Sequence, residues 1–501
     1  MDAVKPSRGI VVFGGGTATN SLVDVFENLR RSRNCSLQYI IPISDNGGSS
    51  SELIRVFGGP GRLVRLIPPA DTDAERVALK SIFNHRLSAD PSPARSEWLD
   101  IVEGRHELWA DISSEKRELI RSIFNHMNME IVKRARPSSI FNFAKASIGN
   151  LFLTGARLFT GSLESAIYLL STICAVPSTV ATLPAINSNF THHISAGLED
   201  GSQITGQNAI SHPSAPTSLP DTATVTAESP STSPFDPLSK HDSHPSTLPM
   251  ITTTSTTTPP PNPFQDRQVV LRETEAHDRI EDATLPGSLP SLRKPYLSFT
   301  KEAPPHTNDL PSRISRIWYI NPYGHEIYPV ANPKVVTAIL HSISVIYSVG
   351  SLYTSLMPSL VLGGVGRAIA ALSSPAHQKI LILNSTLDRE TGPTSNPLTA
   401  TDFVRAIARA CAEIQGADAD SLGNVDDQVR RYVTHLLYLE GEGVPKVNKT
   451  ELAALGVDCI RVYGRRVDGI LCYDEAGLVG ALEAVVGKTE MVRSRRNTSG
   501  Q

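Results

Sequence analysis

The stretch IVVFGGGTATNSLV, Ile10–Val23, decides the fold. Arg8–Phe13 is a short apolar, β-branched run, which predicts a buried strand. The apolar residues of Thr17–Arg31 recur at helical spacing, which predicts a helix directly after that strand. The glycines between them let the main chain approach a phosphate closely, and the helix start offers free N–H groups to an anion. The phosphate-binding candidates of this first turn are Gly14, Gly15, Gly16 and Thr17.

This first turn matches neither the G-x-G-x-x-G fingerprint nor a Walker loop, so a plain tight turn is the alternative. A second glycine-rich turn follows in IPISDNGGSSSELIRVFGGPG, Ile41–Gly61. Leu37–Ser44 predicts a second strand, and the capping box from Ser49 to Glu52 predicts a helix over Ser50–Phe57.

Asp45 stands at the end of this second strand, where Rossmann-type sheets commonly place a ribose or metal ligand. It is therefore the candidate catalytic and metal-binding acid, although plain capping of the next helix is the alternative. The phosphate-binding candidates of this turn are Gly47, Gly48 and Ser49.

A third turn occurs in YSVGSLYTSLMPSL, Tyr347–Leu360. Ser344–Val349 predicts a strand and Tyr353–Leu372 a helix. The candidates here are Gly350, Ser351 and Thr354, whose hydroxyls suit a phosphate at the helix start. Plain capping of the helix by Ser351 is the alternative.

Strand and helix patterns alternate along the chain, which predicts a doubly wound, Rossmann-like α/β domain with a mostly parallel sheet over residues 8–490. Residues 71–136 are charged and helical without strands, and we expect a helical insertion there. The pentapeptide SIFNH occurs in it twice, at Ser81–His85 and Ser122–His126, which is too few copies for a solenoid. We expect a disordered internal linker over residues 211–313. Its first part is the most biased, because Ser, Thr and Pro supply 33 of the 52 residues from 211 to 262.

The remaining predicted elements are a hairpin over His192–Gly206, strands at Ser178–Ala185, Lys379–Ser385, Tyr432–Leu439 and Cys459–Tyr463, and helices at Ser147–Thr172, Asp402–Cys411 and Glu475–Val486.

Composition narrows the classes of function. The 501 residues include 47 basic and 50 acidic ones, a formal net charge of -3, so no general attraction to nucleic acid or an anionic membrane is expected. The five cysteines contain no C-x-x-C pair, which indicates neither a zinc site nor a disulfide framework and favours a reducing compartment. The N-terminus does not resemble a secretory signal, and Pro358 and Arg367 interrupt the longest apolar stretch. We therefore expect a cytoplasmic protein.

The first and second turns, Ser147–Asn150, the third turn at Gly350–Ser355, and Asn384 with Glu390-Thr391 downstream resemble, in this order, the sequence blocks of the CofD-like, or 2-phospho-L-lactate transferase, family. That family includes the YvcK-like gluconeogenesis factor proteins. The resemblance adds Asn150 and Asn384 as nucleotide-binding candidates. It implies transfer of a 2-phospholactyl group from a nucleotide diphosphate donor to a deazaflavin alcohol, with Mg²⁺. For other members it implies binding of a UDP-sugar without turnover.

The sequence departs from the family pattern where Asn46 replaces a second acid and where Gly58–Gly61 runs directly into Arg62. We expect a transferase of phosphorus-containing groups, with a nucleotide-sugar-binding regulator as the alternative that these departures favour. A third alternative, a folded chain that binds nothing, rests on the same shortened loop. The expected partners are a nucleotide diphosphate or nucleotide-sugar and, in a homodimer, a second copy of the chain.

Overall fold

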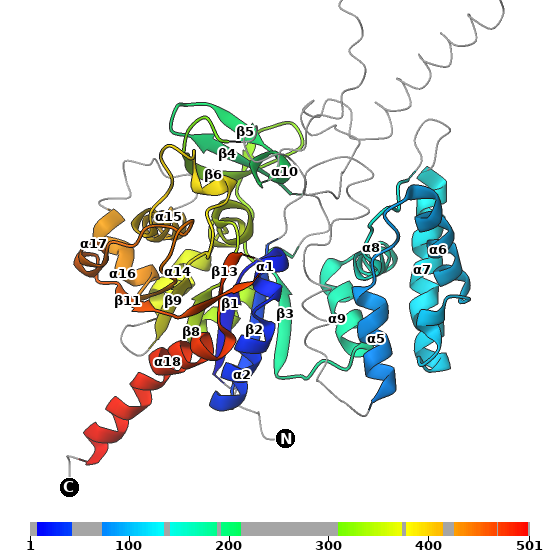
Figure 1. Ribbon diagram of the computed structural model, residues 1–501, viewed down its shortest axis with the longest axis horizontal. Helices are drawn as coiled ribbons and strands as arrows, with labels where there is room; N and C mark the ends of the chain where they lie inside the picture. Colours follow the sequence, from blue (N-terminus) through cyan, green and yellow to red (C-terminus); the bar gives the residue numbers. More distant parts are fainter. Residues whose placement is uncertain are drawn as a thin grey trace, which may run out of the picture.

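The computed structural model describes residues 8–42, 73–134, 141–187, 192–211, 309–372, 377–413, 425–467 and 469–498 (Figure 1). Its centre is a seven-stranded sheet in the order β11-β10-β9-β8-β1-β2-β3, and all neighbouring strands are parallel. The strands are β1 (Gly9–Phe13), β2 (Ser36–Ile41), β3 (Val180–Pro184), β8 (Ser342–Tyr347), β9 (Gln378–Ile382), β10 (His435–Tyr438) and β11 (Asp458–Arg461). The predicted doubly wound parallel sheet is confirmed.

The strand order reverses between β1 and β8. From β1 the chain builds outward through β2 to β3, and from β8 it builds outward the other way through β9 and β10 to β11. Phe13 pairs with Tyr347 at the ends of the two central strands, and their rings stack with centroids 5.9 Å apart. In a sheet of this Rossmann order, ligands bind beyond the carboxyl ends of the strands at the point of reversal.

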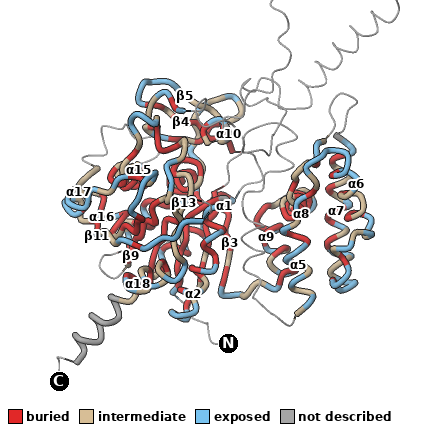
Figure 2. Tube along the Cα trace, viewed as in Figure 1, coloured by how far each residue is buried: buried red, intermediate tan, exposed pale blue. Residues whose placement is uncertain are grey.

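Both faces of the sheet are covered by helices, and successive residues of β1 contribute alternately to the cores on the two faces. Ile10 and Val12 belong to a core with α2 (Val23–Arg33) and α18 (Glu475–Thr498). Val11 and Phe13 belong to the opposite core, built with α12 (Pro333–Leu340), α13 (Met357–Leu360), α14 (Val365–Ala371) and α15 (Ala400–Ala412). Every residue of β1 is buried because neighbouring side chains of a strand point to opposite, covered faces (Figure 2).

Three predicted helices are broken in the structure. The helix expected over Ser147–Thr172 is α8 (Ile148–Thr160) and then α9 (Leu163–Ile173), because Gly161 has a left-handed φ of 69° and Ser162 caps α9. The helix expected over residues 17–31 is α1 (Gly16–Asn20), a turn, and then α2. The helix expected over residues 353–372 is a π-helix η3 (Leu352–Leu356), then α13, then α14. Pro358 lacks the N–H that would continue the helix, and Gly364 at the start of α14 has a left-handed φ of 97°. Hydrophobic spacing alone predicted continuous helices across these breaks.

A helical lobe contains α5 (Ala74–Asn84), α6 (Pro91–Glu103), η1 (Glu107–Trp109), α7 (Ser114–Arg134), α8 (Ile148–Thr160) and α9 (Leu163–Ile173). Trp98 and Phe124 lie at its centre with ring centroids 5.3 Å apart. The lobe shares one core with the sheet, because α9 packs beside β3. Glu164 on α9 also forms a 2.7 Å ion pair with Lys334 on α12.

A smaller antiparallel sheet has the order β5-β4-β6-β7. It contains the predicted hairpin, which turns at Asp200-Gly201, where Gly201 has φ 85°. Its strands are β4 (His193–Leu198), β5 (Gln203–Thr205), β6 (Ile314–Ile320) and β7 (Glu326–Ile327). The remaining elements are α10 (Gln207–Ser211), η4 (Arg389–Thr391), η6 (Val425–Gln428), α16 (Val429–Tyr432), α17 (Lys449–Ala454) and the hairpin of β12 (Gly464–Val467) and β13 (Ile470–Tyr473). None of the helices in the described ranges is long and apolar enough to cross a lipid bilayer.

The predicted linker falls almost entirely on residues 212–308, which lie outside the described residues. The segments that flank it are anchored to one loop: Arg389 Nε donates to Ile210 O at 3.0 Å, and Thr394 N donates to Asp309 Oδ2 at 2.8 Å. Strands β4 and β6 also pair directly across this interval of sequence. The two ends of the interval are therefore held near each other by residues outside it.

We expect that replacing residues 212–308 with a short Gly/Ser spacer leaves the thermal midpoint nearly unchanged. The segment is too polar and Pro-rich to build a core, and loop-closure cost changes only logarithmically with length. Asp309 and Leu310 stay in the variant, because Leu310 is only 2% exposed. Differential scanning calorimetry measures the outcome, and a fall of many degrees would mean that the segment packs on the domain.

Candidate functional site

The first glycine turn leaves β1 at Phe13 and enters α1, so Gly16 and Thr17 form the start of that short helix. A Cβ at Gly14 would lie 2.3 Å from Thr19 Oγ1 and 3.2 Å from Ser348 Cβ. A Cβ at Gly15 would lie 3.1 Å from the Pro42 ring. Glycine is thus needed here for close packing of neighbouring turns, in addition to any contact with a phosphate.

The first and third turns lie against each other. Ser348 N donates to Phe13 O at 2.9 Å, and Thr19 Oγ1 donates to Val349 O at 3.0 Å. Gly350 has φ 144°, a conformation that favours glycine, and a Cβ there would lie 3.7 Å from Gly15 O. Two of the predicted turns therefore meet where the strand order reverses.

Ser351 precedes η3 and is half-buried, and its side chain makes no capping hydrogen bond. The capping role that was the alternative for this serine is therefore not observed. Ser351 follows Gly350 in the third turn, and its hydroxyl takes no part in capping the helix start.

Thr354 is only 3% exposed, and its hydroxyl donates to Glu390 Oε1 at 2.5 Å. Glu390 also accepts the main-chain N–H groups of Tyr353 and Thr354, at 2.8 and 2.9 Å. Burial, together with the charge of Asp388, raises the pKa of Glu390, while these hydrogen bonds oppose the rise. Thr354 thus stabilises the third turn through its hydrogen bonds to Glu390. Its expected contact with phosphate stays a prediction.

Asn384 follows β9, and its Oδ1 accepts the N–H of Gly350 at 2.8 Å. This bond ties the end of β9 to the third turn, so Asn384 positions the turn. Asn150 lies in the first turn of α8 on the helical lobe, where it is half-buried. Its predicted contact with a nucleotide stays a prediction.

The second turn begins where β2 ends beside β1, since Phe13 is in register with Ile40. The ring of Pro42, the last described residue before it, lies 3.1 Å from the position that a Cβ of Gly15 would take. Residues 43–72 lie outside the described residues, and Asp45, Gly47, Gly48 and Ser49 are among them. The structure therefore brings together the first and third turns and Asn384, and the second turn stays a prediction.

Two residues that hold the turns together, Thr19 and Glu390, were not among the predicted site residues. Thr19 and its partner Val349 are 330 residues apart, so no local pattern links them. Glu390 is visible in the sequence only as part of a family block. Two surface hollows, of about 360 and 540 Å³, lie along α5 of the lobe and not at the turns. Both hollows therefore belong to the helical lobe. The second turn lies outside the described residues.

A doubly wound parallel sheet with two glycine turns meeting at its point of reversal defines a Rossmann-like α/β protein. The chain belongs to the 2-phospho-L-lactate transferase CofD family, whose model matches residues 10–462. The resemblance seen in the sequence is confirmed.

Similar proteins agree with this assignment. The uncharacterized protein YNL011C of Saccharomyces cerevisiae is 36% identical over 459 residues, which cover 90% of this chain and 95% of that protein. A gluconeogenesis factor of Halalkalibacterium halodurans is 26% identical over 203 residues, covering 40% of this chain and 45% of that protein. The crystal structure of protein BH3568 from Bacillus halodurans has a TM-score of 0.52 at 17% identity, covering 95% of this chain and 99% of that one. This last likeness shows the same fold.

Proposed function

We propose that this chain binds a nucleotide diphosphate beyond the carboxyl ends of β1 and β8 and transfers a phospho-group from it to an alcohol acceptor, with the nucleoside monophosphate as the leaving group. The observation that carries the proposal is the meeting of the Gly15 and Gly350 turns at the point where the strand order reverses. Main-chain N–H groups there, and the hydroxyl of Ser351, suit the oxygens of a diphosphate. Family membership supports the reaction class.

Phospho-group transfer depends mainly on positioning and on neutralising charge at the transferred group. The glycine turns would hold the donor, and Asn384 and Glu390 would keep the third turn in place. Asp45 would hold Mg²⁺, which supplies charge neutralisation at the phosphates. The five cysteines are all unpaired, which supports our placing this activity in the cytoplasm.

The second candidate is a nucleotide-sugar-binding regulator without turnover. Asn46 favours it, because one family acid is missing beside Asp45. The similarity to a gluconeogenesis factor favours it as well. Both candidates share the diphosphate site and differ in the need for Mg²⁺ and an acceptor.

We expect a nucleoside diphosphate or its sugar conjugate to raise the thermal midpoint, since a ligand of the native state stabilises it by mass action. Ser351→Ala should weaken that binding about tenfold or more, because a hydrogen bond to a charged group contributes about 1.5–3 kcal/mol. The fold should not change, since Ser351 makes no capping bond. Titration calorimetry across ADP, GDP, UDP and UDP-sugars measures both effects.

Ser122→Ala is the matched control for this variant. Ser122 is exposed on α7, and its hydroxyl donates only to a carbonyl of its own helix, Leu119 O. Its removal should leave nucleotide affinity unchanged. Wild-type affinity in the Ser351 variant, or no response to any nucleotide in the panel, would count against a diphosphate at this turn.

A further inference from the structure

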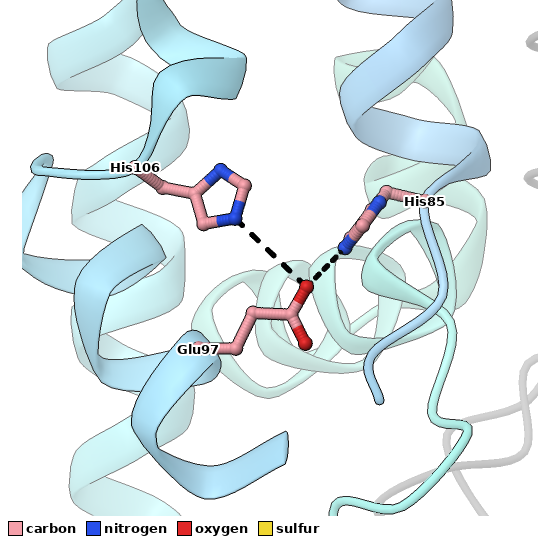
Figure 3. A group of neighbouring side chains, drawn as sticks. All are labelled: His85, Glu97 and His106. Carbon is pink, nitrogen blue, oxygen red and sulfur yellow. Dashed lines mark hydrogen bonds and ion pairs between the residues drawn. The ribbon is translucent and has the colours of Figure 1, made fainter. Parts of the chain in front are cut away.

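His85, Glu97 and His106 meet in the helical lobe, in a part of the molecule that the proposed function does not use (Figure 3). His85 directly follows α5, Glu97 lies within α6, and His106 precedes η1. One donor atom from each residue lies within 4.8 Å of the other two. Glu97 Oε1 is 2.6 Å from His85 Nε2 and 3.8 Å from His106 Nε2. Within the described ranges, His85, Glu97 and His106 are the group of three histidine, cysteine or acidic side chains whose donor atoms lie this close together.

The backbone on both sides of the cluster is held by hydrogen bonds. Ile148 N donates to His85 O at 3.0 Å, which ties the end of α5 to α8. Both His106 main-chain groups are bonded, with His106 N donating to Asp100 O at 3.2 Å and His106 O accepting from Trp109 N at 3.2 Å. The segments that carry the three side chains are therefore largely organised without a ligand.

The carboxylate of Glu97 is oriented by a further bond. Ser88 N donates to Glu97 Oε2 at 2.9 Å, which turns Oε1 toward the two histidines. A bonded outer oxygen that orients the inner one is the arrangement that supports carboxylate ligands in metal sites. This feature is not needed for a simple surface ion pair.

We propose that His85, Glu97 and His106 form a binding site for a divalent transition-metal ion, with Zn²⁺ as the ion that this donor set suits. Two imidazoles and one carboxylate form a ligand set that zinc uses in proteins with a fourth position open to water. Ligand atoms of a tetrahedral zinc site stand about 3.3 Å apart. The three donor atoms need only small side-chain rotations to reach that spacing. The side chains are 28%, 22% and 17% exposed, so water reaches the fourth position.

Cysteine content does not bear on this site, since its ligands are nitrogen and oxygen. The sequence indicated no zinc site because it lacks C-x-x-C pairs, a criterion that applies to thiolate ligands, and the histidine and acid spacing here follows no familiar sequence pattern. The three residues are brought together by the packing of α5 against η1 and of α6 within the lobe.

Binding requires a change at His106. Leu108 N donates to His106 Nδ1 at 3.2 Å, so the neutral ring carries its proton on Nε2. A metal at Nε2 takes the place of that proton, and the neutral ring then carries its proton on Nδ1. The bond from Leu108 must open. The hydrogen bond between His85 Nε2 and Glu97 Oε1 is likewise replaced, because both atoms would then bind the metal.

The duplicated pentapeptide supplies a matched control. His85 and His126 occupy the same place in the two SIFNH copies, and both lie in the lobe. His126 contacts Phe159 edge-to-face, with ring centroids 5.9 Å apart, and is not part of the His85 cluster. His126→Ala therefore removes one histidine of the lobe without touching the proposed ligands.

The test uses the full chain, stripped with a chelator and titrated with ZnCl₂ by calorimetry at pH 7.5. We expect one Zn²⁺ per chain and a raised thermal midpoint. Glu97→Gln should raise the Kd on the order of 100-fold, the upper range for losing even an outer partner of a metal. The amide of Gln can still accept from Ser88 and bond to His85, so the fold should persist, which circular dichroism of the metal-free protein checks.

His106→Ala should weaken binding similarly, and His126→Ala should leave it unchanged. Substituting Co²⁺ should give the visible bands of a four-coordinate ion in the wild type and not in Glu97→Gln. Binding that is unaltered in both ligand variants, or no stoichiometric binding by the wild type, would overturn the proposal. The cluster would then be a hydrogen-bond network that joins α5, α6 and η1.

Discussion

Asp45→Asn should lower any phospho-group transfer by about 10²-fold or more, because an acid that assists the acceptor or holds Mg²⁺ contributes at least that much. The fold should persist, since Asn and Asp are nearly the same size and both cap helices well. Nucleotide binding should fall only modestly, because the first and third turns, which are in place without Asp45, would supply most contacts. Turnover with deazaflavin-type and simpler alcohols, measured by product mass, gives the result.

The same experiment separates the two candidate functions. A regulator would give no product with any acceptor even in the wild type, and its affinity for the nucleotide would change little when Mg²⁺ is removed. Asn46→Asp is the matched companion, because it restores the acid that the family carries there. An enzyme-type site predicts equal or faster turnover in that variant, whereas wild-type turnover in Asp45→Asn would remove this acid from the mechanism.

Gly366→Ala should destabilise the protein by about 3 kcal/mol, at the upper end of what overpacking commonly costs. Gly366 lies in α14, and a Cβ there would lie 1.8 Å from Cys411 O and 2.7 Å from Cys411 C, in α15. Backbone atoms cannot rotate away as a side chain can, so the two helices must separate. Urea unfolding at fixed pH measures the loss.

Gly480→Ala is the control for a glycine in a helix. Gly480 lies in α18 with nothing within 4 Å of its would-be Cβ. Alanine there should stabilise the protein by roughly 0.5–1 kcal/mol, because glycine loses more chain entropy on folding. If Gly366→Ala behaves in the same way, α14 and α15 do not approach each other as closely as the structure has them.

The sequence predicted those features that depend on neighbouring residues along the chain. The buried run at Gly9–Phe13 forms a central strand because both faces of that strand are covered. The repeated strand–helix pattern predicted the doubly wound sheet. The hairpin at Asp200-Gly201 followed from turn chemistry, since glycine adopts the left-handed conformation that the turn requires.

Helix interruptions were predicted less well. The apolar spacing of residues 17–31 and 353–372 continues across positions where the main chain changes direction. At the first of these, Thr19 turns inward to bond Val349, a partner far away in sequence. At the second, Pro358 and Gly364 are residues that interrupt helices, although the apolar spacing predicts a continuous helix across them.

The class of fold and the family could be predicted from the sequence, because both depend on residues close together in the chain, whereas the binding of a ligand at the glycine turns stays a prediction. Which of the turns meet depends on tertiary packing. Gly15 and Gly350 face each other because β1 and β8 are neighbours in the sheet. Tertiary packing also places the Thr354 hydroxyl against Glu390 and brings the side chains of His85, Glu97 and His106 together in the lobe. Such contacts depend on how helices and strands pack, and a pattern of adjacent residues does not contain that information.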